Sequence, residues 1–300
     1  MKTSVKKSAK ILAAALLVLF TACSSAPKRS MAVTTLQVSS AEFIQSANGA
    51  ILSGNFEKAD QLLNSAFSIA MSVDNCNQLS TICLARVSLC LSHNPPKIDD
   101  AKKYLAMADC YADYGTQTEK FKALVELGSV RIALEDETST ESADSLITKL
   151  DQNISAVKKD AYNEAQFKSV KGDVYKKAGK LSEAEASYRD AAKLYTDNRY
   201  LSELGISWYK ISQVCSLNKK KSDALTAINN AIFYDRSAEN SSALGADYYA
   251  KGLILSKTPY TPSQIKEADF CFQHSADIYN SIGMKDAAAK SAAKISGKNE

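Results

Sequence analysis

The sequence predicts an all-α fold, an α-solenoid of about six antiparallel helical hairpins followed by a C-terminal closing helix. Three observations lead to this prediction. Small and apolar residues recur along the chain at intervals of 40 to 44 residues. No proline occurs between Lys97 and Thr258, so nothing in that segment forbids a helix. The alternation of apolar and polar residues that marks strands is absent.

The repeat is centred on an alanine that follows polar or charged turn residues. An apolar residue stands four positions later, and a small or apolar residue three positions after that. These three positions share one face of a helix, so each alanine is expected at a packed position of a hairpin. The six alanines are Ala59, Ala101, Ala143, Ala184, Ala224 and Ala268, at intervals of 42, 42, 41, 40 and 44 residues.

Residues 165–195 carry the fullest pattern, two helices joined by a turn at residues 178–180. Gly172 and Ala184 are expected to let the two backbones approach, with Tyr175 and Tyr188 filling the volume beside them. Gly179 suits the turn. This spacing resembles the tetratricopeptide repeat. The family's usual unit has about 34 residues, so the longer period here adds about two helical turns per hairpin. The resemblance implies a right-handed superhelix with a concave groove.

Residues 1–22 predict a targeting signal. Four lysines precede an apolar run over residues 11–20, which is about half the ~20 residues that a membrane-spanning helix needs. Cys23 then resembles the lipidated cysteine of the bacterial lipobox, although Phe20 stands where that pattern has Leu. The alternative is a plain secretory signal with an incidental cysteine. Lipidation would give a stable membrane anchor.

The charge of the chain excludes nucleic acid as an expected partner. Removal of the four signal lysines leaves 33 basic residues against 33 acidic ones. A net-neutral chain has no basic stripe for phosphates.

The remaining elements follow in order. Residues 23–38 are expected to be a flexible tether, and residues 39–296 the repeat domain. Capping boxes are predicted at Ser39–Glu42, with ordered structure beginning near Ser40, and at residues 116–119, 138–141 and 261–264. Prolines at 95, 96, 259 and 262 fall in expected turns. The three lysines at residues 219–221 are expected to form a solvated turn. Residues 284–296 are the expected closing helix.

Enzymatic signals are nearly absent, so the chain is expected to be no enzyme and to bind no cofactor or metal. The two histidines, His93 and His274, form no nucleophile–base arrangement, and Cys90-x-x-His93 lacks a second half. Cys76, Cys83 and Cys90 lie on one helix face, each about 10 Å from the next, too far apart to pair. Cys110 is expected across from Cys83 or its neighbours. One inter-helix disulfide and small buried thiols remain the two alternatives.

The resemblance places the first helix of each repeat along the groove. Trp208 and Tyr248 are expected to be buried, which turns Tyr209 and Tyr249 toward the concave side, where they would hold an extended peptide or an amphipathic helix. The alternative is that these two rings pack against the next repeat. The expected groove residues are Gln166, Ser169, Asp173, Lys176 and Lys177, then Ile206, Tyr209 and Gln213, then Ala246, Tyr249 and Leu253.

Together these features predict a lipoprotein of the cell envelope that faces the periplasm. Ser24 follows the cysteine in place of an inner-membrane retention Asp, which favours the outer membrane. The expected function is a scaffold or adaptor that binds an envelope protein or peptide. A periplasmic accessory of a solute transporter, with a ligand- or lipid-conducting helical body, is the alternative, and a cell-wall enzyme accessory is a third. A conduit needs an enclosed apolar cavity, whereas an adaptor needs an open groove.

Overall fold

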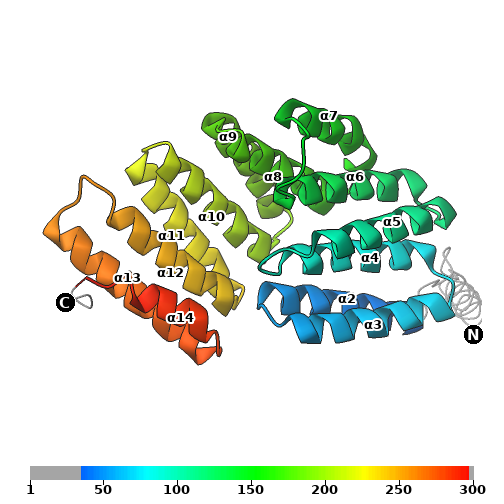
Figure 1. Cartoon of the computed structure of the whole chain (residues 1–300), viewed down its shortest axis with the longest axis horizontal. Helices are drawn as coiled ribbons and strands as arrows, with labels where there is room; N and C mark the ends of the chain where they lie inside the picture. The colour runs from blue at the N-terminus through cyan, green and yellow to red at the C-terminus, as the bar shows by residue number, and fades with distance from the viewer. Residues whose placement is uncertain (1–34, 297–300) are drawn as a thin grey trace, which may run out of the picture.

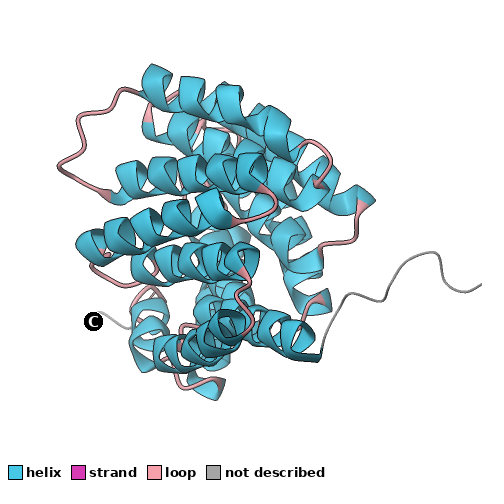
Figure 2. Cartoon of the chain, turned by 90° about the vertical axis from the view of Figure 1, so that its right-hand side faces the viewer, coloured by secondary structure: helices cyan, strands magenta, loops and turns pink. Residues whose placement is uncertain are grey.

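The computed structural model describes residues 35–296, and the predicted signal, Cys23 and most of the tether lie outside them. The described chain forms thirteen α-helices and one 3-10 helix, with no strand (Figure 2). The first helices of the hairpins are α2 (Thr35–Leu52), α4 (Cys76–Leu91), α6 (Thr118–Glu135), α8 (Ala161–Lys177), α10 (Leu201–Leu217) and α12 (Ser241–Leu255). The second helices are α3 (Phe56–Ser72), α5 (Ile98–Tyr114), α7 (Ala143–Asn153) with η1 (Ile154–Val157), α9 (Leu181–Asp197), α11 (Lys221–Ser237) and α13 (Pro262–Ser281). Helix α14 (Lys285–Ala292) follows, which confirms six hairpins and a closing helix.

The hairpins stack along a curved path. Four pairs of first helices touch directly, namely α2 with α4, α4 with α6, α6 with α8, and α10 with α12. The first helices therefore line the inner side of the curve. The path bends far enough that α2 and α3 lie beside α12 and α14 (Figure 1). A Cβ on Gly54 would lie 3.8 Å from Cε of Met284 at this junction.

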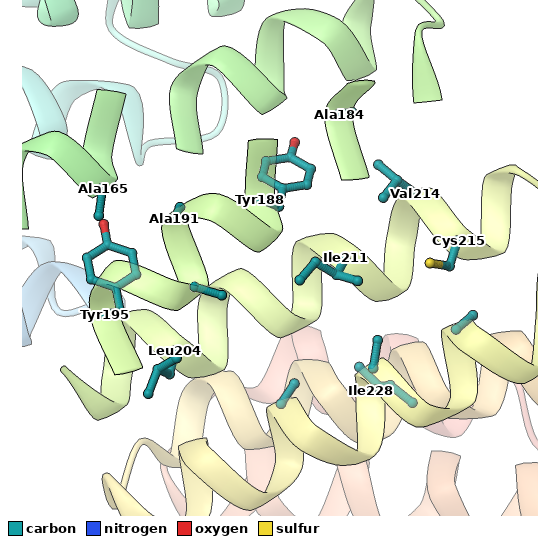
Figure 3. Packing of buried hydrophobic residues seen from close by; sticks show 14 of the residues in the cluster. Ala165, Ala184, Tyr188, Ala191, Tyr195, Leu204, Ile211, Val214, Cys215 and Ile228 are labelled. Atoms are coloured by element: carbon teal, nitrogen blue, oxygen red, sulfur yellow. The ribbon is translucent and has the colours of Figure 1, made fainter. Parts of the chain in front are cut away.

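The predicted repeat register is confirmed. Five of the six repeat alanines are buried, and Ala143 is half-buried because it is the first residue of α7. One cluster shows the resulting core, in which Ile211 and Val214 of α10 lie between residues of α9 and Ile228 of α11 (Figure 3). From α4 onward, each first helix packs against its own second helix and against the second helix of the preceding hairpin.

Gly172 lies against the ring of Tyr188, one of the two tyrosines expected to fill the volume beside it. A Cβ on Gly172 would lie 2.5 Å from Cε1 of Tyr188, so the glycine makes room for this fully buried ring. The Tyr188 hydroxyl donates a 2.7 Å hydrogen bond to Oδ1 of Asp173. Gly179 has φ of +75°, as the predicted turn requires.

Leucine at position 184 is expected to destabilise the chain by about 1–3 kcal/mol, since Ala184 has no exposed surface and the larger side chain must displace its neighbours. Denaturant unfolding of the variant measures this cost. The matched control is Lys193→Ala on the exposed face of the same helix. Equal midpoints for both variants would contradict the assigned register.

Three predicted capping boxes are wrong, because the predicted cap residue lies within a helix or has a different bonding role. Helix α2 begins at Thr35, so the predicted cap Ser39 lies within the helix. The neighbouring Ser40 is buried, and its Oγ donates to the carbonyl of Ala66 at 3.2 Å. Thr116 accepts a 2.7 Å hydrogen bond from Nδ2 of Asn77 in the preceding hairpin. Thr138 donates to Oδ1 of Asp136 at 2.6 Å. The observed N-caps of α6 and α7 are Gln117 and Ser142, and only the box at Thr261 is present as predicted.

The cysteines of residues 35–296 are all free thiols. Cys83 is buried against Ala108 and Tyr111 of α5, whereas Cys110 is exposed on another face of that helix. Cys110 therefore does not lie against Cys83, and no inter-helix disulfide forms within the described residues.

The lysine run at residues 219–221 is not a free solvated turn. Nζ of Lys221 donates to the carbonyls of Leu255, Lys257 and Pro259 at 2.7 to 3.0 Å. Because these carbonyls lie at or just after the end of α12, the lysine ties the α12–α13 connection to α11. Lys220 pairs with Glu185 at 3.1 Å.

Candidate functional site

The predicted groove residues lie on α8, α10 and α12, and two of these helices are joined by polar contacts. Nζ of Lys176 donates to Oε1 of Gln213 at 3.0 Å. Asp173 accepts 2.7 Å hydrogen bonds from Nζ of Lys210 and from the hydroxyl of Tyr188. Lys210 also reaches Oγ of Ser169 at 3.1 Å. The inner surface here is a polar network that fixes α8 against α10.

Lys210 is a groove residue that sequence reasoning missed. It follows Tyr209 directly and lies 37 residues after its partner Asp173. The same offset separates Lys176 from Gln213. Pairs of complementary polar residues at this spacing on successive first helices could therefore have identified Lys210 from the sequence.

Other predicted lining residues keep more of their surface free. Lys177 is exposed and its Nζ donates to the carbonyl of Leu134 near the end of α6. Leu253 exposes 38 % of its surface. Half-buried positions are Gln166, Ile206 and Ala246.

The two tyrosines expected in the groove are half-buried and pack in part against the helices behind them. Tyr209 contacts the core cluster of α9 to α11, and burial raises the pKa of its hydroxyl. The Tyr249 ring lies 5.7 Å from the ring of Phe272, with Nζ of Lys290 5.6 Å from its centroid. Trp208 is half-buried and Tyr248 is buried. Each of the two predicted groove tyrosines therefore combines a packing role with a partly exposed surface.

Two cations of this surface lack an acidic partner. Within residues 35–296, every buried or half-buried Lys or Arg has a carboxylate oxygen within 4.0 Å, except Arg131, Lys176 and Lys221. Lys221 is held by three carbonyls, as described above. Arg131 donates only to Oγ of Ser88, at 2.8 Å. Lys176 donates only to Gln213.

A buried pair of acids lies behind the tyrosines. Asp235 of α11 and Asp247 of α12 are each 1 % exposed and share a hydrogen bond, and Nδ2 of Asn240 donates to Oδ1 of Asp235 at 3.2 Å. Burial raises the pKa of both carboxyls, so they are held together by a shared proton. A Cβ on Gly205 would lie 2.3 Å from Oδ2 of Asp235, so only glycine fits opposite the pair.

The described residues contain no cluster of three or more His, Cys, Asp or Glu side chains suited to a metal ion. None of the helices in residues 35–296 has the length and apolarity needed to cross a bilayer. A cavity of about 680 Å³ lies where the first and last hairpins meet, and its lining is mostly Gly, Ser and Asn, with Leu52, Ile282 and Met284.

The same arrangement of helices occurs in solved structures. The apo form of RapI aligns with a TM-score of 0.51 at 10 % identity, over 85 % of this chain and 95 % of that one. Aspartyl phosphate phosphatase F from Bacillus subtilis aligns with a TM-score of 0.53 at 11 % identity, over 87 % and 70 %. A signal-transduction ATPase with a tetratricopeptide repeat sensor from Pyrococcus horikoshii gives 0.49 at 16 % identity, over 85 % and 41 %. No protein-family model and no curated protein matches the chain. The two matches above 0.5 show that the chain has a tetratricopeptide-like α-solenoid fold.

Proposed function

We propose that this chain is a non-enzymatic scaffold that binds another protein or a peptide along its concave surface. The observation that carries the proposal is the inner face of α8, α10 and α12, which presents polar and aromatic side chains that remain partly exposed. Solenoids of this kind pack only against their neighbouring repeats, so their inner surface is free for a partner.

The binding proposal is tested by substitutions at exposed positions of this face. Lys177→Glu with Leu253→Asp is expected to weaken capture of the wild type's envelope partner at least tenfold, because both side chains are exposed on this face. Phe233→Asp on α11 is the control, since this ring is 63 % exposed on a second helix. Loss of capture by the control, with capture retained by the double variant, would contradict the proposal.

We also propose that the scaffold is anchored to the outer membrane, facing the periplasm, through acylated Cys23. The sequence of residues 1–23 supports this anchor. Cys23→Ala is expected to move the protein from the membrane fraction to the soluble periplasmic fraction, because a single lipidated residue would supply the anchor. Fractionation of cells followed by immunoblotting measures this shift. An unchanged membrane fraction that still needs detergent for release would contradict the lipoprotein assignment.

The lining of the junction cavity supports a scaffold over a conduit for a transporter. A lipid or apolar solute needs an enclosed apolar path. The cavity is lined chiefly by small and polar residues and lies between the two ends of the solenoid. Its surface is therefore about as polar as it is apolar, unlike the apolar path that a conduit would use.

A further inference from the structure

We propose that the buried pair of Asp235 and Asp247 is a pH-sensitive hinge between the last two hairpins, which opens the junction between the two ends of the solenoid when the pair loses its shared proton. The hinge sets the position of α12, α13 and α14 relative to the rest of the chain. This inference goes beyond the proposed binding function and does not depend on it, because it concerns the shape of the scaffold.

The first argument is the place of the pair at an interface between hairpins. Asp235 belongs to α11, the second helix of the fifth hairpin, and Asp247 to α12, the first helix of the sixth. Both are 1 % exposed, and apart from the shared proton their Oδ2 atoms have no donor among the described residues. Two neighbouring carboxylates repel each other once both are charged. That repulsion would act directly across the packing of α12 on α11.

The second argument is that the surroundings supply no compensating charge. Among the described residues, no lysine, arginine or histidine acts on either carboxyl. The neighbouring Arg236 donates to the hydroxyl of Tyr248 at 2.9 Å. The titratable groups that face Asp247 from other helices are Tyr209 of α10 and Tyr279 of α13, and burial raises the pKa of both hydroxyls. These tyrosines therefore stay neutral over the range in which the carboxyls ionise.

The third argument is that the pair can relax in one direction only. A Cβ on Gly205 would lie 2.3 Å from Oδ2 of Asp235, so this carboxyl already lies against the backbone of α10. Separation of the two charges therefore requires that α12 move away from α11. Helix α13 packs on α12 and α14 packs on α13, so the last hairpin and the closing helix would move together.

The fourth argument is a chain of hydrogen bonds from the pair to the junction. Nδ2 of Asn240 donates to Oδ1 of Asp235, and Oδ1 of Asn240 accepts from the N–H of Ala243 at 3.3 Å, which caps α12. Residues 238–242, which include this cap, line the junction cavity together with the α2–α3 turn. Glu239, the charged residue of this turn, is exposed, so its carboxylate stays hydrated. A displacement at the acid pair is thus passed to one wall of the cavity.

The fifth argument is that little holds the two ends together. The hydrogen bonds made by residues 49–55, 238–242 and 282–284 all stay within their own end of the chain, and none of these residues forms an ion pair with another described residue. The contact across the junction is the apolar approach of Met284 to Gly54. These turns can therefore separate without the loss of a hydrogen bond or an ion pair.

The test measures the distance across the junction by double electron–electron resonance. Spin labels are attached at Ser65→Cys on α3 and Ser281→Cys at the end of α13, two exposed positions. The full chain also carries serine at Cys76 and Cys110, which leaves only the buried thiols Cys83, Cys90, Cys215 and Cys271 among the described residues. The mean distance between the labels should lengthen as the pH rises from about 5 to about 9.5, because the pair then loses its proton.

Two controls separate the hinge from other effects of pH. Labels at Ser65→Cys and Ser222→Cys, on α3 and α11, lie on the same side of the hinge, so their distance should stay constant. Asp247→Asn should keep the junction closed at pH 9.5, because its amide would donate to Asp235 without a shared proton. Asp197→Asn, on the exposed face of α9, should respond to pH as the wild type does.

A junction distance that is constant with pH would overturn the inference, and so would equal lengthening in Asp247→Asn. Lengthening of both label pairs would mean that the chain unfolds as a whole, which also overturns it. Each of these results leaves the proposed function standing, since none of them measures partner binding.

Discussion

Replacement of Tyr188 by alanine is expected to lower the free energy of unfolding by about 3–5 kcal/mol, the largest loss that we predict for a single substitution. The ring has no exposed surface and lies against Gly172, so alanine would leave a cavity between α8 and α9. It would also leave Oδ1 of Asp173 without the hydroxyl donor that now lies 2.7 Å away. Urea unfolding followed by circular dichroism measures the change.

Tyr188→Phe separates the two contributions, because it removes the hydroxyl and keeps the ring. Its expected cost is about 1 kcal/mol. Gly172→Ala provides a coupled test, since its methyl group would press on the ring, and it should cost less in a Tyr188→Leu background. A Tyr188→Ala variant that unfolds at the wild-type midpoint would show that the packing of this hairpin is wrong.

Asparagine at position 247 is expected to stabilise the protein at pH 8 by about 1–4 kcal/mol, the range seen when buried charges are replaced by neutral groups. Apart from the proton that the two carboxyls share, Oδ2 of Asp235 and Oδ2 of Asp247 have no donor among the described residues. An asparagine amide would donate to Asp235 without needing a shared proton. The control is Asp197→Asn on the exposed face of α9.

The direction of the pH dependence follows from the raised pKa of both carboxyls. The folded chain keeps a proton that the unfolded chain releases above about pH 4, so its stability falls as the pH rises. The wild-type melting temperature should therefore decrease between pH 5 and pH 8.5, while that of Asp247→Asn should decrease less. Parallel curves for the two proteins would mean that the pair does not share a proton.

The fold could be predicted from the sequence because its signals are local and repeated. Helical spacing places Ala184, Tyr188 and Ala191 on one face, and the structure buries all three. Starts of helices were predicted less well. Ser39, Thr116 and Thr138 fit the capping pattern, but Ser39 lies within α2 and the two threonines form their hydrogen bonds elsewhere. A short motif does not reveal which partner a hydroxyl will meet in the folded chain.

The chemistry of the inner surface could be predicted only in part, because it depends on contacts between repeats. Asp173 and Lys176 were identified from their position in one repeat, but the link from Asp173 to Lys210 requires the packing of α8 on α10. The missing counter-charge of Arg131 is a property of all its neighbours together. The same is true of the shared proton between Asp235 and Asp247, which lie on different helices.

The central claim is that the partner binds the concave surface. Site-specific photo-crosslinking in the cell that makes the protein tests this claim most directly. A photoreactive phenylalanine analogue that replaces Leu253, on a first helix, should give a covalent adduct of one defined mass. The same residue at Phe233, which is exposed on a second helix, should give none. An adduct at Phe233 with none at Leu253 would contradict the account.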